Sequence, residues 1–142
     1  MEKNNKPYSD SSSLKLAFST DFHSFTVIHH RFHGYFGSNK NWIAIPEVPG
    51  TLKTSVVSDG LKNPLYTVNI KFRVAYDSEV NRMELDKWTA SRVLATYKSA
   101  SGKDMVAGTK SSPLTFSYSK VEGFDGYECT LTGVQITPEC FV

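Results

Sequence analysis

Polar and apolar residues alternate most regularly between positions 65 and 77. From residue 68 to residue 76 every even position is apolar, and the odd positions from 67 to 73 are polar. The apolar positions are Val68, Ile70, Phe72, Val74 and Tyr76, and the polar positions are Thr67, Asn69, Lys71 and Arg73. A period of two residues is typical of a β-strand with one face on a core and the other in water. We therefore predict a strand that buries its even-numbered side chains.

The period changes after Asp77. Residues 78–91 contain neither Gly nor Pro, are rich in Glu, Met, Leu and Lys, and place Val80, Leu85 and Trp88 near helical spacing. This composition and spacing predict one short helix, over about residues 80–91. The helix would place Leu85 and Trp88 over the sheet.

Short alternating runs elsewhere predict further strands. Turn-forming residues separate these runs, as is typical of hairpins, and they lie at residues 42–45, 52–57, 93–98, 105–108, 114–119 and 127–136. In the run at 93–98, the alternating sets are Val93, Ala95 and Tyr97 against Leu94, Thr96 and Lys98. About nine short strands with one helix predict a mainly β fold, a single-domain antiparallel β sandwich or barrel. We assign this domain to residues 14–142.

Two irregularities are expected within these strands. Pro46 and Pro49 follow the run at 42–45 and mark it as a strand exit or an edge, because proline cannot donate to a central ladder. In the last run the apolar positions change from odd to even at Gly133. One extra residue reverses the facing of a strand, so this change predicts a β-bulge at that glycine.

Composition and charge narrow the possible functions. The formal charge of the 142-residue chain is only +2, with both signs interspersed, which argues against specific nucleic-acid binding and against an anionic membrane surface. No run approaches the roughly 20 apolar residues of a membrane helix, and the polar N-terminus does not read as a secretory signal peptide. We therefore expect synthesis in the cytoplasm, and retention there unless a complex carries the protein out. Residues 1–13, rich in Ser and Asn, predict a flexible N-terminal arm that is either a loose tail or a segment that orders on a neighbouring subunit.

The histidines and cysteines are the residues that most invite a metal or redox hypothesis. All four histidines lie between His23 and His33 in a stretch that favours extended structure. In a straight strand, His29 and His33 would stand about 13 Å apart, too far to share a zinc ion bound at about 2.0 Å. We therefore expect no metal site and histidines that face solvent or form hydrogen bonds. Cys129 and Cys140 are expected to be free, partly buried thiols, with a disulfide as the alternative.

The sequence specifies no reaction. It contains no Gly-rich phosphate loop, Cys-x-x-Cys pair, His-Glu-x-x-His motif or Gly-x-Ser-x-Gly elbow. We therefore expect a protein that is not an enzyme and has no cofactor. The aromatic residues Tyr35, Phe36 and Trp42 lie beside polar turns, where they could stack on a sugar ring or belong to the core.

The second half of the chain carries a recognisable order of features. After the strand at 65–77 and the helix come Tyr97-Lys-Ser-Ala-Ser-Gly-Lys-Asp-Met-Val-Ala-Gly-Thr, Ser112-Pro-Leu-Thr-Phe, Gly123-Phe-Asp-Gly-Tyr-Glu-Cys-Thr-Leu-Thr-Gly and finally Pro138. From about residue 66 onward this order resembles small β-rich structural proteins encoded among the neck and tail genes of phages and prophages of Bacteroidetes. Such sequences often have Asn-Gly where this chain has Ser101-Gly102, and the first 40 residues fall outside the resemblance.

The resemblance implies a virion subunit, made in the bacterial host cytoplasm, whose function is assembly. It would form a homo-oligomeric ring and contact other virion proteins, without a membrane or a specific nucleic acid. The candidate interface residues are Asn69, Lys71, Arg73, Trp42, Tyr35 and Phe36. The alternative function is a β-sandwich binding module for carbohydrate or another surface ligand, which Tyr35, Phe36 and Trp42 would hold.

Overall fold

In the computed structural model, which describes residues 9–142, the predicted amphipathic strand is β7 (Tyr66–Ala75). It pairs antiparallel with β6 (Lys53–Ser58) on one side and β11 (Gly126–Gln135) on the other. The side chains of Val68, Ile70, Phe72 and Val74 are at most 4% exposed, as predicted. The prediction for Tyr76 was wrong, because the strand ends at Ala75 and the Tyr76 side chain is 69% exposed. A φ of 75° at Tyr76 turns the chain away from the sheet and toward the helix.

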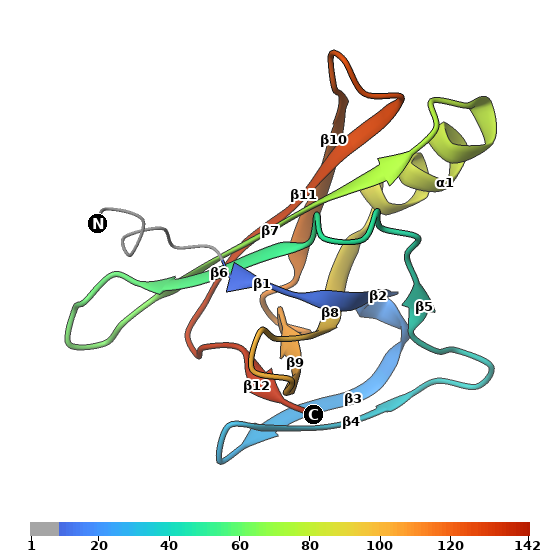
Figure 1. The fold of residues 1–142 in the computed structure, drawn as a ribbon. Coiled ribbons are helices and arrows are strands. Elements are labelled where there is room, and N and C mark those ends of the chain that lie inside the picture. Colours follow the sequence, from blue (N-terminus) through green and yellow to red (C-terminus); the bar gives the residue numbers. More distant parts are fainter. Residues whose placement is uncertain (1–8) are drawn as a thin grey trace, which may run out of the picture.

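The strands form one large, mostly antiparallel open sheet, which confirms the mainly β single-domain fold (Figure 1). Its order after β1 (Ser9–Asp10) is β6, β7, β11, β10 (Leu114–Lys120), β8 (Arg92–Lys98), β9 (Asp104–Ala107), β12 (Cys140–Phe141), β4 (Arg31–Phe36) and β3 (Phe22–Ile28). On the other side of β8 lies β2 (Ser12–Phe18), which also pairs with β5 (Ile43–Ala44).

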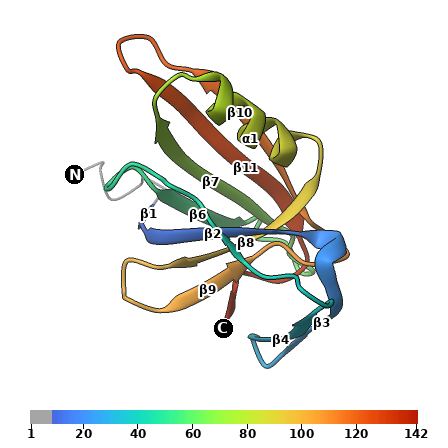
Figure 2. The same cartoon turned by 90° about the vertical axis from the view of Figure 1, so that its right-hand side faces the viewer.

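The sheet bends so that its two halves form two layers. Figure 2 shows β7, β10 and β11 in one layer and β2, β8 and β9 in another, which crosses beneath it. The main core fills the space between the layers and is closed by the helix α1 (Glu79–Thr89). Its large buried members include Leu14, Leu16, Ile70, Phe72, Leu114, Phe116, Tyr127 and Leu131.

The helix α1 confirms the predicted helical segment. Ser78 caps its N-terminus by accepting a hydrogen bond from the Asn81 N–H at 3.1 Å. Leu85 and Trp88 are 5% exposed and lie in the main core, and the Trp88 ring stacks on Phe18 with ring centres 4.6 Å apart. Val80, the third residue of the predicted apolar stripe, is exposed instead.

A second, smaller core lies on the opposite face of β2 and β8. The 3-10 turn η2 (Ser19–Asp21) leads from β2 into the β3–β4 hairpin, which covers this face. Ala17, Phe22 and Leu94 are fully buried there, and four rings pack against them: Phe25, Phe32, Phe36 and Trp42. Strand β8 is therefore buried on both faces at residues 93–95. Leu94 is buried although the alternation places it on the same face as the polar residues Thr96 and Lys98.

The predicted bulge at Gly133 is absent, and that prediction was wrong. β11 pairs with β7 in one unbroken register, from Gly126 opposite Ala75 to Gln135 opposite Tyr66. Its inward positions therefore stay odd, and the inward place at the end of the strand belongs to a polar residue, Gln135, which is 3% exposed. Its Oε1 accepts from the Gly108 N–H at 2.9 Å, and its Nε2 donates to the carbonyl oxygens of Thr137 and Pro138. Buried polar groups are tolerated when they are hydrogen-bonded, so Gln135 can occupy an inward position and the alternation of β11 continues without a shift. Val134 and Ile136 therefore stay exposed.

The predicted N-terminal arm does not extend to residue 13. Ser9 and Asp10 pair with Thr54 and Lys53 of β6, and Ser12 begins β2. These residues belong to the sheet because they add main-chain hydrogen bonds to its edge. Residues 1–8 of the predicted arm lie outside the described residues.

Candidate functional site

The polar row predicted as an interface lies on the outer face of β7. Asn69 and Lys71 are half-buried, and so is Arg73, whose guanidinium lies 5.1 Å from the centre of the Phe124 ring. The register places Thr132 and Thr130 of β11 beside Asn69 and Lys71. The row is therefore one part of a broader face.

This outer face continues across β11 to β10. Thr132 stands opposite Thr115, and Thr130 stands opposite Ser117, so small hydroxyl side chains extend the row over three strands. Their side chains are short and regularly spaced along the strands. The side chains exposed here are Thr67, Thr115, Ser117, Ser119, Thr132 and Val134.

The three aromatic candidates do not form one surface. Phe36 and Trp42 are half-buried in the second core, where their ring centres lie 5.7 Å apart and each ring contacts Phe22. Tyr35 precedes Phe36 in β4, so it points to the opposite face, and its side chain is 74% exposed. The structure thus assigns Phe36 and Trp42 to the core and leaves Tyr35 alone on the surface.

The four histidines are exposed, as predicted, although the assumption of a straight strand was wrong. His29 and His30 are the two turn residues between β3 and β4, with φ of 52° and 63°. Two successive residues of positive φ are typical of the tight turn that closes a two-residue hairpin. Among residues 9–142, no group of three or more His, Cys, Asp or Glu side chains is placed to hold a metal ion.

Cys129 and Cys140 are free, buried thiols, as predicted. Burial raises the pKa of Cys129 to about 12 and that of Cys140 to about 11. A thiol is a nucleophile only as the thiolate, so neither cysteine is poised for covalent chemistry at neutral pH.

Strand β3 is a free edge at one end of the sheet. In the described part of the chain it pairs with β4 alone. The register shifts near His23, at the start of the strand, and residues 24–28 then pair regularly. The strand contains no Lys, Arg, Asp, Glu or Pro, and it ends in Thr26, Val27 and Ile28, which are β-branched.

A polar network fixes the helix to the tips of the strands. The Asp77 carboxylate accepts from Lys120 Nζ at 2.7 Å, from the Tyr127 hydroxyl, and from Arg82. These hydrogen bonds, that of Lys120 first, hold the pKa of Asp77 well below its usual range. Every group in this cluster has partners, so we interpret it as a structural network that holds α1 against β10 and β11.

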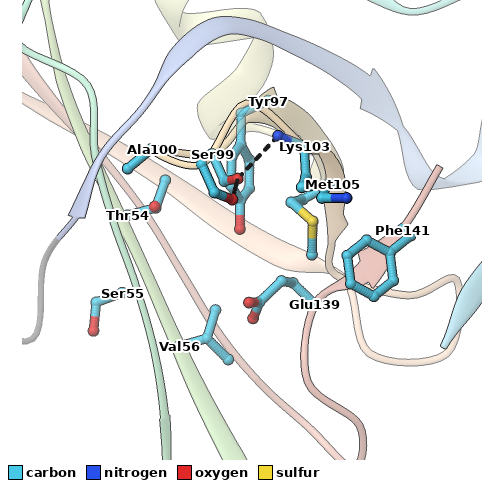
Figure 3. Close-up of a pocket in the computed structure, with 11 residues that line it drawn as sticks. Thr54, Ser55, Val56, Tyr97, Ser99, Ala100, Lys103, Met105, Glu139 and Phe141 are labelled. Atoms are coloured by element: carbon cyan, nitrogen blue, oxygen red, sulfur yellow. Dashed lines mark hydrogen bonds between the residues drawn. The ribbon is translucent and has the colours of Figure 1, made fainter.

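A groove of about 490 Å³ lies between β6, the β8–β9 hairpin and the segment that leads into β12 (Figure 3). It is lined by Thr54, Ser55, Val56, Tyr97, Ser99, Ala100, Ser101, Lys103, Met105, Glu139 and Phe141. The turn between β8 and β9 is tightened by the Lys103 N–H, which donates to Ser99 Oγ at 3.3 Å. Three segments far apart in the sequence form this groove, so periodicity within one segment could not reveal it.

Glu139 is the unusual residue of this groove. Its Oε2 is shielded from solvent and has no hydrogen-bond partner among the described residues. Figure 3 shows the carboxylate extending into the groove below the Tyr97 hydroxyl. Burial, followed by the negative charge of Glu139, raises the pKa of Tyr97, so its hydroxyl stays protonated and able to donate.

Comparisons of this chain with family models, with curated proteins and with solved structures found no match. Within residues 9–142, no helix has the length and apolar character needed to cross a membrane. The function must therefore be argued from the surfaces described above.

Proposed function

We propose that this protein is a non-enzymatic structural subunit of a bacterial virus, placed in the neck or tail of the virion, and that it works by oligomeric assembly. The observation that supports assembly most directly is the free edge of β3. The resemblance of the chain, from about residue 66 onward, to small β-rich neck and tail proteins of phages supports its assignment to a virus particle. The subunit would be made in the host cytoplasm and would contact copies of itself and other virion proteins.

The β3 edge is suited to pairing with another strand. Soluble proteins usually protect a sheet edge with Lys, Pro, a strong twist or a covering segment, because unpaired N–H and C=O groups recruit other strands. Residues 24–28 of β3 carry no charge and no proline. A strand added here would gain main-chain hydrogen bonds without a large apolar patch.

The outer face of β7, β11 and β10 supplies a second, different surface. A ring requires that one surface of each subunit contact another surface of the next. The hydroxyl-rich face, with Asn69, Lys71 and Arg73 along β7, can serve as such a second contact surface, because it lies apart from the β3 edge. In the proposed assembly it faces a neighbouring subunit.

The hairpin geometry identifies one substitution that blocks the edge without opening the hairpin. Ile28 and Arg31 flank the two-residue turn, and such flanking residues exchange hydrogen bonds. Hydrogen-bonded and non-hydrogen-bonded residue pairs alternate along an antiparallel hairpin. Val27, one residue before Ile28, therefore belongs to a non-hydrogen-bonded pair, and its N–H points to the free edge. Val27→Pro removes that donor, whereas Val27→Ala shortens the side chain and keeps it.

The experiment is light scattering on the purified full chain over a range of concentrations, alone and with candidate neck and tail proteins. We expect a mass that is a multiple of the chain mass, a monomer for Val27→Pro and an unchanged oligomer for Val27→Ala. A strictly monomeric wild-type protein under all these conditions would refute the proposal. Assembly that survives a Lys71→Glu, Arg73→Glu double change would exclude the β7 face as a contact.

A further inference from the structure

We propose that the groove around Glu139 binds a cation on an aliphatic stem, a primary ammonium or a guanidinium such as the end of a lysine or arginine side chain. This inference does not depend on the proposed assembly, because the groove lies within one chain. It rests on the carboxylate, on the acceptors around it and on the apolar walls of the groove.

The carboxylate supplies both the charge and an unmet hydrogen-bonding capacity. A buried oxygen that accepts no hydrogen bond is costly, and more so when it belongs to a carboxylate. Glu139 is half-buried and lines the groove, so the group lies at the groove wall. The terminal torsion of a Glu side chain turns easily, which allows either oxygen to meet a donor in the groove.

The other charged group at the groove does not satisfy Glu139. Lys103 is exposed, and no ion pair within 4 Å joins it to Glu139 in the described part of the chain. Its backbone N–H is used within the β8–β9 turn. The carboxylate therefore remains available to a ligand.

The hydroxyls and the apolar side chains define the shape of that ligand. The Tyr97 hydroxyl lies above the carboxylate, and the hydroxyls of Thr54 and Ser99 also line the groove. Thr54 is hydrogen-bonded to Ser11 and Ser99 to Ser101, but a hydroxyl oxygen has two lone pairs, and an ammonium has three donors to distribute among such acceptors. Met105 and Phe141 form part of the wall, and they suit the methylene stem that lysine and arginine carry behind the charge. A volume of about 490 Å³ is within the usual range of small-ligand sites and exceeds what a single water needs.

The test titrates the full chain with butylammonium and butylguanidinium, and follows the amide signals by two-dimensional NMR. We expect saturable shifts confined to residues 54–56, 97–105 and 139–141. Butyrate, which has the opposite charge on the same stem, and uncharged butanol should produce no saturable shift. Because these two probes act on the unaltered protein, they keep the test decisive even if a variant folds poorly.

The matched variants are Glu139→Gln and Glu122→Gln, of which the second changes an exposed carboxylate outside the groove. We expect Glu139→Gln to weaken binding of both cations by at least about tenfold and Glu122→Gln to leave it unchanged. Either the absence of saturable shifts with both cations, or equal binding of the cations to Glu139→Gln, would overturn the proposal.

A further titration, with a short lysine-containing peptide, distinguishes a protein side chain from a free amine as the source of the cation. Tighter binding of the peptide than of butylammonium identifies a protein side chain as the ligand, and equal binding identifies a free amine. Both results support the site. A monomeric protein that binds butylammonium would refute assembly and leave this inference intact, whereas an oligomer without cation binding would do the reverse.

Discussion

The burial of Leu94 allows a quantitative test of the fold. Leu94 is 0% exposed and lies in the second core, with Ala17 of β2 opposite it in the sheet. Leu94→Ala removes the equivalent of about three methylene groups, which at about 0.8 kcal/mol each amounts to about 2.4 kcal/mol of transfer free energy. The cavity left behind adds to this loss, so the free energy of unfolding should fall by about 3–4 kcal/mol. If Leu94 shared the polar environment of Thr96 and Lys98, the loss would be about 0.5 kcal/mol or less.

The assay is equilibrium unfolding in urea, followed by circular dichroism and by tryptophan fluorescence. Trp42 borders the second core and Trp88 lies in the main core, so a Trp88→Phe background isolates the signal of the second core. Coincident transitions would show that the hairpin and the main core unfold together. Leu61→Ala is the matched control, because Leu61 is 68% exposed. A loss below about 1 kcal/mol for Leu94→Ala, with an unchanged urea dependence, would refute the packing of the β3–β4 hairpin on β8.

Two further predictions concern Gly133 and Asp77. A Cβ at Gly133 would lie 2.7 Å from Leu114 Cδ2, so Gly133→Ala should cost about 1–3 kcal/mol in thermal unfolding. At Gly37 the nearest atom would be 3.6 Å away, so Gly37→Ala should be nearly neutral, and equal melting temperatures for the two variants would contradict this reasoning. The folded pKa of Asp77 lies below its unfolded value of about 3.9, so its carboxylate stabilises the fold above that pH and loses this effect as the pH falls through the acid range. The urea midpoint of the wild type should therefore fall more steeply below about pH 5 than that of Asp77→Asn, and parallel pH profiles would contradict the assignment.

Where one face of a strand or helix is buried and the other faces water, the hydrophobic period of the sequence was enough to predict which residues face the core. The inward residues of β7, from Val68 to Val74, and the inward pair Leu85 and Trp88 of α1 were predicted correctly. The reason is local, because residues two apart in a strand, or three to four apart in a helix, lie on one side whatever the rest of the chain does. The mainly β class with one helix follows from the same patterns.

Local periodicity failed where contacts between distant segments decide the environment. Leu94 was grouped with polar neighbours, because the alternation within β8 does not reveal that a hairpin covers its second face. Gln135 takes an inward place because Gly108 and the segment after β11 satisfy its amide. Tyr76 follows the alternation but lies beyond the end of the strand, at a backbone turn.

By itself, the sequence determined the strands from β5 to β11, the helix and the polar row of β7, since each depends on residues within one segment, but it did not predict β1, β2 or β12. Only the tertiary structure decided that the sheet is open and bent, that β3 is left as one of its edges, and that Glu139 lies in a groove beside Tyr97. These features join residues as far apart as Thr54 and Phe141, and no pattern within a segment encodes which distant segment will pack against it. The candidate sites belong to this second group, because both a groove and a free edge depend on where the chain does not cover itself.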